Sequence, residues 1–162
     1  MDNSVFNVDK IRYDLLENFF LRPFVMNVHD ILDLDIDAHL TIAAGVFTLA
    51  GRSLVELEDG SRQMWLFADE DLFLSISPDA EEMMLFTLLE TPIEKDDEMV
   101  VEGGKDYEFS YEDRGNVKKA EGESPYDEDE DLEFSDYEAD DGHVVRIITN
   151  TFNGEERSFV GH

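Results

Sequence analysis

Apolar and polar positions follow two different periods along the chain. From Val8 to Phe19, apolar residues recur at spacings of three and four. This spacing predicts an amphipathic helix. Pro23 disfavours continuation of that helix. We expect the apolar face to pack on a sheet. The alternative is that this helix docks on a partner protein.

The period changes to two after residue 31. Leu32, Leu34 and Ile36 alternate with three aspartates. This alternation predicts a half-buried strand whose other face is charged.

The chain is rich in strand patterns from Leu40 onward. The first two runs are "LTIAAGVFTLAG" and "RSLVELEDGS", and the second contains Asp59 and Gly60, a pair typical of a hairpin turn. The next run places Trp65 and Phe67 on one face. Ser77, followed by Pro78 and acids, predicts one helical turn before a further strand.

The second half repeats this order. Strict alternation predicts that Tyr107, Phe109 and Tyr111 share one face. Two further strands are expected at Val144–Thr151 and Glu156–Val160, joined through an Asn-Gly turn.

The sequence therefore predicts a mainly β (α+β) protein. The fold expected is two small SH3-like or half-barrel β lobes with an N-terminal amphipathic helix. The predicted parts are residues 1–39 for the helix and first strand, 40–91 for the first lobe, and 92–162 for the second lobe. An acidic loop at 124–143 is expected within the second lobe.

Charge is the strongest compositional signal. The chain has 41 Asp and Glu residues against 12 Lys and Arg, a net charge of −29, and 22 of the acids fall in residues 90–143. Such a surface repels nucleic acid and anionic lipid, so direct binding of either is not expected. A basic protein face or a polyamine is favoured as partner, with attraction that weakens as salt rises.

Several classes of site are excluded or unsupported. The chain has no cysteine, which excludes disulfides and thiolate metal sites. It has no apolar run of about 18 residues, the length of a spanning helix, and its first ten residues lack a signal-peptide pattern. The histidines show no metal-ligand spacing and no nucleotide or nucleophile motif occurs. We expect a cytoplasmic protein that is not an enzyme and has no cofactor.

The run from Ser124 to His143 holds ten carboxylates and no Lys or Arg. One interpretation is a solvated acidic loop leading into a charged edge strand, "DLEFSDYE", which would discourage pairing between molecules. The other is a binding surface for a basic partner. The candidate partner-binding residues are Asp127, Glu128, Asp129, Glu130, Asp131, Glu133, Asp136, Glu138, Asp140 and Asp141.

Part of the same run resembles a calcium loop. Asp127, Asp129, Asp131 and Glu138 fall at ligand positions of such a loop. However, Leu132 stands where the loop requires Gly, and the flanks lack helical patterns. These four residues are weak candidates for a looser divalent-cation site.

A mimic of DNA is a further alternative. Area scaling gives about 8,200 Å² of surface, or about one net charge per 280 Å², against about one per 110 Å² on duplex DNA. A mimic would therefore need its carboxylates gathered on one face.

Short motifs relate residues 40–162 to known sequences. The order "TIAAGVFTLAG", "RQMWLFADEDLFLSI" and "EEMMLFTLLETP" resembles the bacterial YjfK-like proteins, a domain of unknown function. A related uncharacterised domain is similar in its G-K-x-Y strand, its R-G turn, its A-E-G-E-x-P turn and its closing "ERSFVGH". These motifs fall at Gly104, Lys105 and Tyr107, at Arg114 and Gly115, at 120–125, and at 156–162.

The resemblance implies a β-rich fold. It also implies an association with membrane-stress proteins similar to phage-shock protein A and with polyamine-related, ligase-like enzymes. It brings no catalytic residues. We therefore expect a non-catalytic acidic accessory or adaptor protein that binds a basic partner, with a DNA-mimic inhibitor as the first alternative and a divalent-cation binder as the second.

Overall fold

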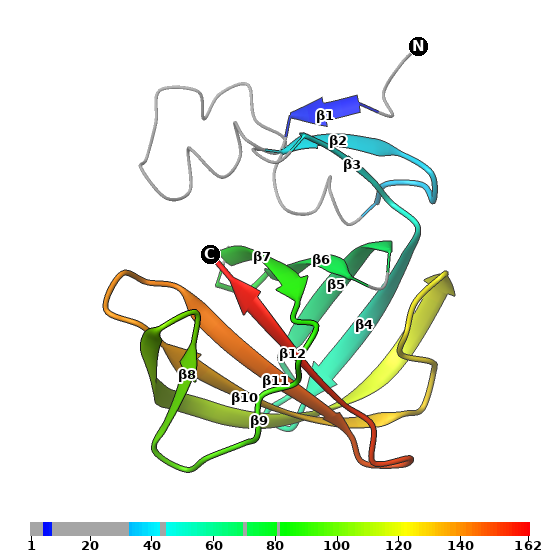
Figure 1. Ribbon diagram of the computed structural model, residues 1–162. Helices are drawn as coiled ribbons and strands as arrows, with labels where there is room; N and C mark the ends of the chain where they lie inside the picture. Colours follow the sequence, from blue (N-terminus) through cyan, green and yellow to red (C-terminus); the bar gives the residue numbers. More distant parts are fainter. Residues whose placement is uncertain (1–4, 8–32, 43–44, 70, 81) are drawn as a thin grey trace.

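The computed structural model describes residues 5–7, 33–42, 45–69, 71–80 and 82–162, and no residue in these ranges is helical. Their regular elements are all β-strands, joined by turns and irregular segments (Figure 1). The first six are β1 (Val5–Asn7), β2 (His39–Ile42), β3 (Gly45–Thr48), β4 (Gly51–Leu57), β5 (Arg62–Asp69) and β6 (Leu72–Ser77). The last six are β7 (Glu82–Leu88), β8 (Met99–Glu102), β9 (Lys105–Gly122), β10 (Asp131–Glu138), β11 (Val144–Asn150) and β12 (Glu156–Gly161).

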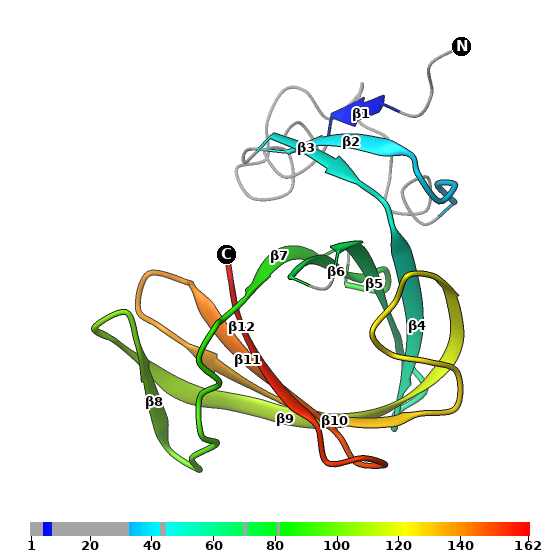
Figure 2. The ribbon, with the colours of Figure 1, turned by 45° about the vertical axis from the view of Figure 1, so that its right-hand side comes forward.

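Eight strands close into one antiparallel barrel, seen end-on in Figure 2. Around the barrel the order is β4, β5, β6, β7, β12, β11, β10 and β9, and β9 pairs with β4 again. The 18-residue β9 makes closure possible, because its first part pairs with β10 and its last part with β4. Closure leaves no free edge within the barrel itself.

This closure corrects the prediction of two SH3-like lobes. Strands from both halves of the chain pair within the same sheet, at β7 with β12 and at β4 with β9. The alternation of apolar and polar residues correctly predicts strands in each half. Period alone does not tell whether a half-sheet closes on itself or on the other half. Mainly β architecture is confirmed.

The barrel is filled by aromatic side chains. Trp65, Phe67, Phe73 and Phe86 are fully buried on its inner face. Phe73 stacks on Phe86 with ring centroids 5.1 Å apart and meets Phe159 edge-on at 4.8 Å. Such contacts supply more burial per residue than aliphatic packing and explain the high phenylalanine content.

Two outer faces of the barrel are covered by other segments. Leu34 and Phe47 pack on the outer face of β5 to β7, against residues such as Leu66 and Leu74. The connection around Ile93, with β8, covers the outer face of β10 to β12. The strands β5 to β7 and β10 to β12 therefore carry apolar residues on both their inner and their outer faces.

The N-terminal predictions differ in outcome. The predicted helix from Val8 to Phe19 lies outside the described residues. The predicted strand at 32–36 is wrong over its described part, where residues 33–38 form turns and irregular backbone. Its in–out pattern does hold, because Leu34 is buried while Asp33 and Asp35 are exposed. An alternation of buried and exposed residues forms a strand only where a neighbouring strand supplies backbone hydrogen bonds.

Three details of the strand prediction also change. Residues 78–80 form a turn, and Ala80 N–H donates to the Ser77 carbonyl at 3.2 Å, so the predicted helical turn is absent there. The resemblance-based R-G turn at Arg114 and Gly115 lies inside β9 instead. The predicted edge strand, β10, pairs on both sides with β9 and β11. By contrast, hairpin turns with left-handed glycines are confirmed at Gly60 and Gly154.

None of the described residues belongs to a helix that is long and apolar enough to cross a membrane.

Candidate functional site

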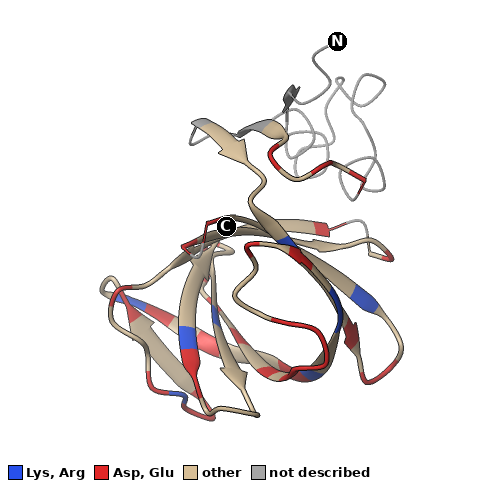
Figure 3. Ribbon diagram, turned by 90° about the vertical axis from the view of Figure 1, so that its right-hand side faces the viewer, with Lys and Arg blue, Asp and Glu red and all other residues tan. Residues whose placement is uncertain are grey.

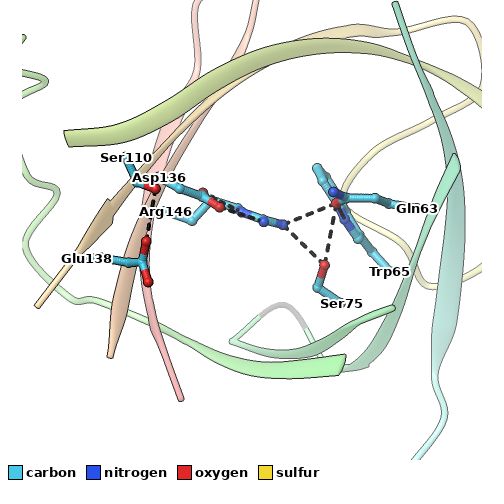
Figure 4. A network of polar contacts seen from close by, with 7 residues as sticks. All are labelled: Gln63, Trp65, Ser75, Ser110, Asp136, Glu138 and Arg146. Carbon is cyan, nitrogen blue, oxygen red and sulfur yellow. Dashed lines mark hydrogen bonds and ion pairs between the residues drawn. The ribbon is translucent and has the colours of Figure 1, made fainter. Parts of the chain in front are cut away.

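One ion pair lies inside the aromatic barrel. Arg146 on β11 and Asp136 on β10 face each other across the inner wall and are both buried (Figure 4). Arg146 Nε donates to Asp136 Oδ1 at 2.8 Å, and its Nη2 donates to Oδ2 at 2.9 Å. This two-point geometry is the strongest arrangement available to an arginine and a carboxylate.

The remaining donors of Arg146 are also used. Nη1 donates to Gln63 Oε1 at 3.3 Å and to Ser75 Oγ at 3.2 Å. The guanidinium lies 4.7 Å from the Phe86 ring centroid and 4.8 Å from that of Phe134. Burial alone would lower the pKa of Arg146, but Asp136 outweighs burial and raises that pKa above its ordinary value.

A bulge in β9 determines what lies beside this pair. The register shifts so that Phe109 lies opposite Tyr137 while Tyr111 lies opposite Asp136. Directly opposite residues share a face, so Phe109 is on the outer wall and Tyr111 on the inner wall. The predicted common face of Tyr107, Phe109 and Tyr111 is therefore wrong at Tyr111. Burial raises the pKa of Tyr111, and Arg146 partly opposes this.

The inner wall continues past Tyr111 to the end of the barrel, which we call the mouth. Glu108 of β9 lies directly opposite Glu138 of β10, and Met99 of β8 lies opposite Glu108. The three side chains therefore form one row on the inner face. Ser110 Oγ donates to Glu138 Oε2 at 3.0 Å (Figure 4). The mouth is thus made of Met99, Val101, Glu108, Tyr111 and Glu138.

The mouth is both acidic and apolar. Glu108 and Glu138 are exposed. Met99 is 43% exposed, Val101 55% and Tyr111 38%, so these are among the most exposed large apolar side chains of the described chain. Two carboxylates directly opposite one another on a ladder destabilise it. A cation placed between them would remove that repulsion.

Nearby cations are engaged elsewhere. Lys105 is paired with Asp141 at the outer end of the β8–β9 hairpin. Lys95 Nζ lies 3.1 Å from Glu112, and Arg114 Nη2 lies 2.5 Å from Glu133. Glu112 lies opposite Ser135, and Glu133 lies opposite Arg114. Because Ser135 and Glu133 alternate with the inward-facing Phe134 and Asp136, Glu112 and Glu133 are on the outer face. The opposed pair at the mouth is therefore balanced by none of these three cations.

A second acidic region lies along the outer side of β4, β9 and β10. It is a groove of about 630 Å³ lined by Glu56, Glu58, Asp131 and Glu133 together with Arg114 and Lys118. We call it the loop groove, because the acidic loop 127–130 adjoins it. Most of its carboxylates have partners within the chain: Glu133 pairs with Arg114, and Asp131 accepts from Asn116 at 2.8 Å.

The ten predicted partner-binding residues do not form one surface. Asp127, Glu128, Asp129 and Glu130 are on the loop before β10, and Asp131 and Glu133 line the loop groove. Asp136 is buried and paired with Arg146, so it is not part of an accessible surface. Glu138 lies at the mouth, with Asp140 and Asp141 in the turn beyond it. Because β10 has eight residues, its two ends are about 24 Å apart.

The acidic positions are also widely distributed. On the side drawn in Figure 3, they occur on strands as well as on turns. Asp127, Asp129 and Asp131 are separated from Glu138 by the length of β10, so the four weak cation ligands do not converge. Within the described ranges, no group of three or more His, Cys, Asp or Glu side chains is placed to hold a metal ion.

Several residues of the site were missed from the sequence. Arg146 stands alone in the apolar run "HVVRIITN". A lone arginine in a strand buried on both faces requires a carboxylate on a neighbouring strand. Asp136, in phase with the apolar Leu132 and Phe134, supplies it. That reasoning could have predicted that Asp136 is buried. It could not have located Glu108, because the alternation of apolar and polar residues does not reveal the β9 bulge.

These features define a closed, aromatic-filled antiparallel barrel with an internal ion pair and an acidic mouth. Residues 38–162 match a family model described as a domain of unknown function, DUF4178. Because the match covers most of the chain, the protein belongs to this family. The match confirms an uncharacterised family and does not confirm the YjfK-like relation. No curated protein and no solved structure matches the chain.

Proposed function

We propose that this protein is a non-catalytic accessory protein that binds a basic partner protein, and that its barrel mouth receives a lysine or arginine side chain of that partner. The observation that carries the proposal is the direct opposition of Glu108 and Glu138 on the ladder. A cation between them gains attraction from two carboxylates and removes their mutual repulsion.

A protein side chain fits the mouth better than a free ion. Met99 and Val101 are exposed on the same face as Glu108, on the β8–β9 hairpin that continues the inner wall beyond the barrel. Long basic side chains bury their methylene stems on apolar surface and keep the charge at the polar end. Tyr111 provides an aromatic ring at the inner side of the mouth, a favourable neighbour for a cation.

The internal ion pair supports this site without taking part in binding. The negative charge of Asp136 offsets the positive charge of Arg146, and the remaining Arg146 donor bonds Gln63 and Ser75, so Arg146 is not directed at Glu108 or Glu138. Asp136 is opposite Tyr111 and holds the wall next to the mouth in a fixed register. We infer that the pair serves to position the mouth.

The experiment uses a fluorescent peptide of alternating lysine and leucine as the basic probe. Binding is measured by anisotropy at low and at physiological salt. The variant Glu108→Gln with Glu138→Gln removes the opposed charges. The matched control, Glu56→Gln with Glu58→Gln, removes the same net charge from the loop groove. We expect the mouth variant to weaken binding about tenfold or more, while the control changes it less than threefold.

Two results would count against the proposal. Equal weakening in both variants would mean that the peptide follows the summed field of the protein, which is what a DNA mimic would produce. Spermidine that displaces the peptide only from the wild type, at micromolar concentration, would instead assign the mouth to a free polyamine.

A further inference from the structure

The end of the barrel opposite the mouth is closed by a loop. Residues 123–130 connect β9 to β10, and Tyr126 from this loop is inserted into the interior with 2% of its surface exposed. Its ring meets Trp65 edge-on, with centroids 5.6 Å apart. The loop backbone is fixed as well, because Ser53 Oγ donates to the Tyr126 carbonyl at 3.0 Å.

Two polar atoms at this end have no protein partner among the described residues. They are the buried hydroxyl oxygen of Tyr126 and the buried Nη1 of Arg157 on β12. The two side chains are neighbours, since the Arg157 guanidinium lies 6.0 Å from the Tyr126 ring centroid. Arg157 Nε donates to Glu155 Oε1 at 2.7 Å, while its Nη1 is buried.

Buried polar groups in folded proteins nearly always have a hydrogen-bond partner, from protein or from ordered water. Two unsatisfied groups side by side therefore indicate a molecule shared between them. We propose that an ordered water molecule binds between Tyr126 Oη and Arg157 Nη1 and links the acidic loop to β12.

The chemistry of the surroundings selects water over an anion. Arg157 Nη1 only donates, whereas the Tyr126 hydroxyl both donates and accepts. Burial raises the pKa of Tyr126, and the nearby Glu155 and Glu130 raise it further against the opposing effect of Arg157. These two carboxylates disfavour an additional negative charge beside the Tyr126 hydroxyl. A water molecule satisfies both groups and adds no charge.

The position of this water has a consequence for the acidic loop. Glu130 accepts from Asn150 Nδ2 at 2.9 Å, and the Asp127 N–H donates to Glu130 at 2.6 Å. The loop is thus bonded directly to the end of β11 through Glu130. The proposed water adds a link from Tyr126, in the middle of the loop, to β12. The exposed carboxylates of Asp127 and Asp129 therefore stand on a backbone that is held from several sides, since the Asp129 N–H also donates to the Val117 carbonyl at 2.8 Å.

Tyr126→Phe tests the proposal, because the two alternatives predict opposite signs. If the hydroxyl binds water, its removal leaves the water and Arg157 with fewer partners, and Tm falls by about 2 to 6 °C. If the hydroxyl is truly unsatisfied, its removal leaves Tm unchanged or raises it, and the proposal is overturned. Tyr137→Phe is the control: its hydroxyl donates to the Asp96 carbonyl at 2.5 Å and accepts from the Asp96 N–H at 3.2 Å, so its loss calibrates a hydroxyl with direct protein partners.

A crystal structure at high resolution provides the direct readout. Density for one water within hydrogen-bonding distance of both atoms supports the proposal. An anomalous peak at this position from crystals grown in bromide would show an anion and overturn the assignment of water. Hydrogen exchange of residues 124–130 should become faster in Tyr126→Phe than in the Tyr137→Phe control, and equal rates would contradict the link between water and loop.

Discussion

The mouth and the loop groove are both acidic, but their carboxylates are in different situations. In the loop groove, Glu133 and Asp131 are bonded to Arg114 and Asn116 of the same chain. At the mouth, Glu108 and Glu138 oppose each other, and Glu138 accepts a hydrogen bond from the uncharged Ser110 hydroxyl. The density of acids and the balance of their charges therefore point to different regions. Our proposal places cation binding at the carboxylates that lack such partners among the described residues.

The largest effect should come from breaking the internal ion pair behind the mouth. Arg146→Met leaves Asp136 buried without a partner, and we expect the free energy of unfolding to fall by about 3 to 5 kcal/mol. Denaturation by urea measures this loss. Adding Asp136→Asn in the same chain should recover most of the loss. No recovery would show that Arg146 acts through its contacts with Phe86 and Phe134 instead.

A smaller effect is expected when one carboxylate is neutralised in each acidic region, because the local contribution to stability should have opposite signs in the two. Glu138→Gln relieves the repulsion from Glu108, which should stabilise by about 0.2 to 1 kcal/mol at low salt. Glu133→Gln removes an ion pair with Arg114, which is worth about 0 to 1 kcal/mol. Both variants share the general relief of negative charge. We therefore expect Glu138→Gln to be the more stable of the two, and the difference to shrink as salt screens both interactions. The reverse order would contradict the comparison.

The smallest effect concerns the turn beyond the mouth. Hydrogen bonds from Lys105 and from the His143 N–H lower the pKa of Asp141, and the bond to Asp141 raises the pKa of Lys105. The stability from Asp141 is therefore present above its unfolded pKa and is lost as pH falls through the lower folded value. Lys105 contributes below its unfolded pKa and loses this as pH rises through the folded value.

An NMR titration of the side-chain carboxyl carbons checks this prediction. Asp141 should titrate below about 3.9, the ordinary value for aspartate. In Lys105→Met its pKa should move upward toward that value. An unchanged pKa in the variant would show that Lys105 does not hold this carboxylate, and Lys105 would then be available to the mouth.

The sequence predicted the strands better than their closure. Periodicity two correctly indicated the strands that became β4, β5, β10, β11 and β12, since each has one face in the barrel core. It failed for closure, because pairing of β9 with β4 and β10 depends on long-range contacts that leave no local signal. It also failed at the β9 bulge, which inserts one residue and turns Tyr111 inward.

The candidate site was predicted only in part. The acidic run contains Glu138, but treating residues 124–143 as one loop merged three elements: a loop, the strand β10 and a turn. The alternation of Leu132 and Phe134 with polar residues indicates the strand inside this run, but the charges around it do not show where the strand begins and ends. Glu108, the partner of Glu138, lies in a different segment. Their meeting is a consequence of register, which becomes visible only in the folded barrel.

The most direct test is an NMR titration of the labelled protein with the lysine–leucine peptide. We predict that the first amide shifts occur at Met99, Glu108, Ser110 and Glu138, and that they vanish in the double glutamine variant of the mouth. Early shifts at residues 56–58 and 127–133 instead, or uniform shifts at every acidic position, would contradict the assignment of the cation site to the mouth.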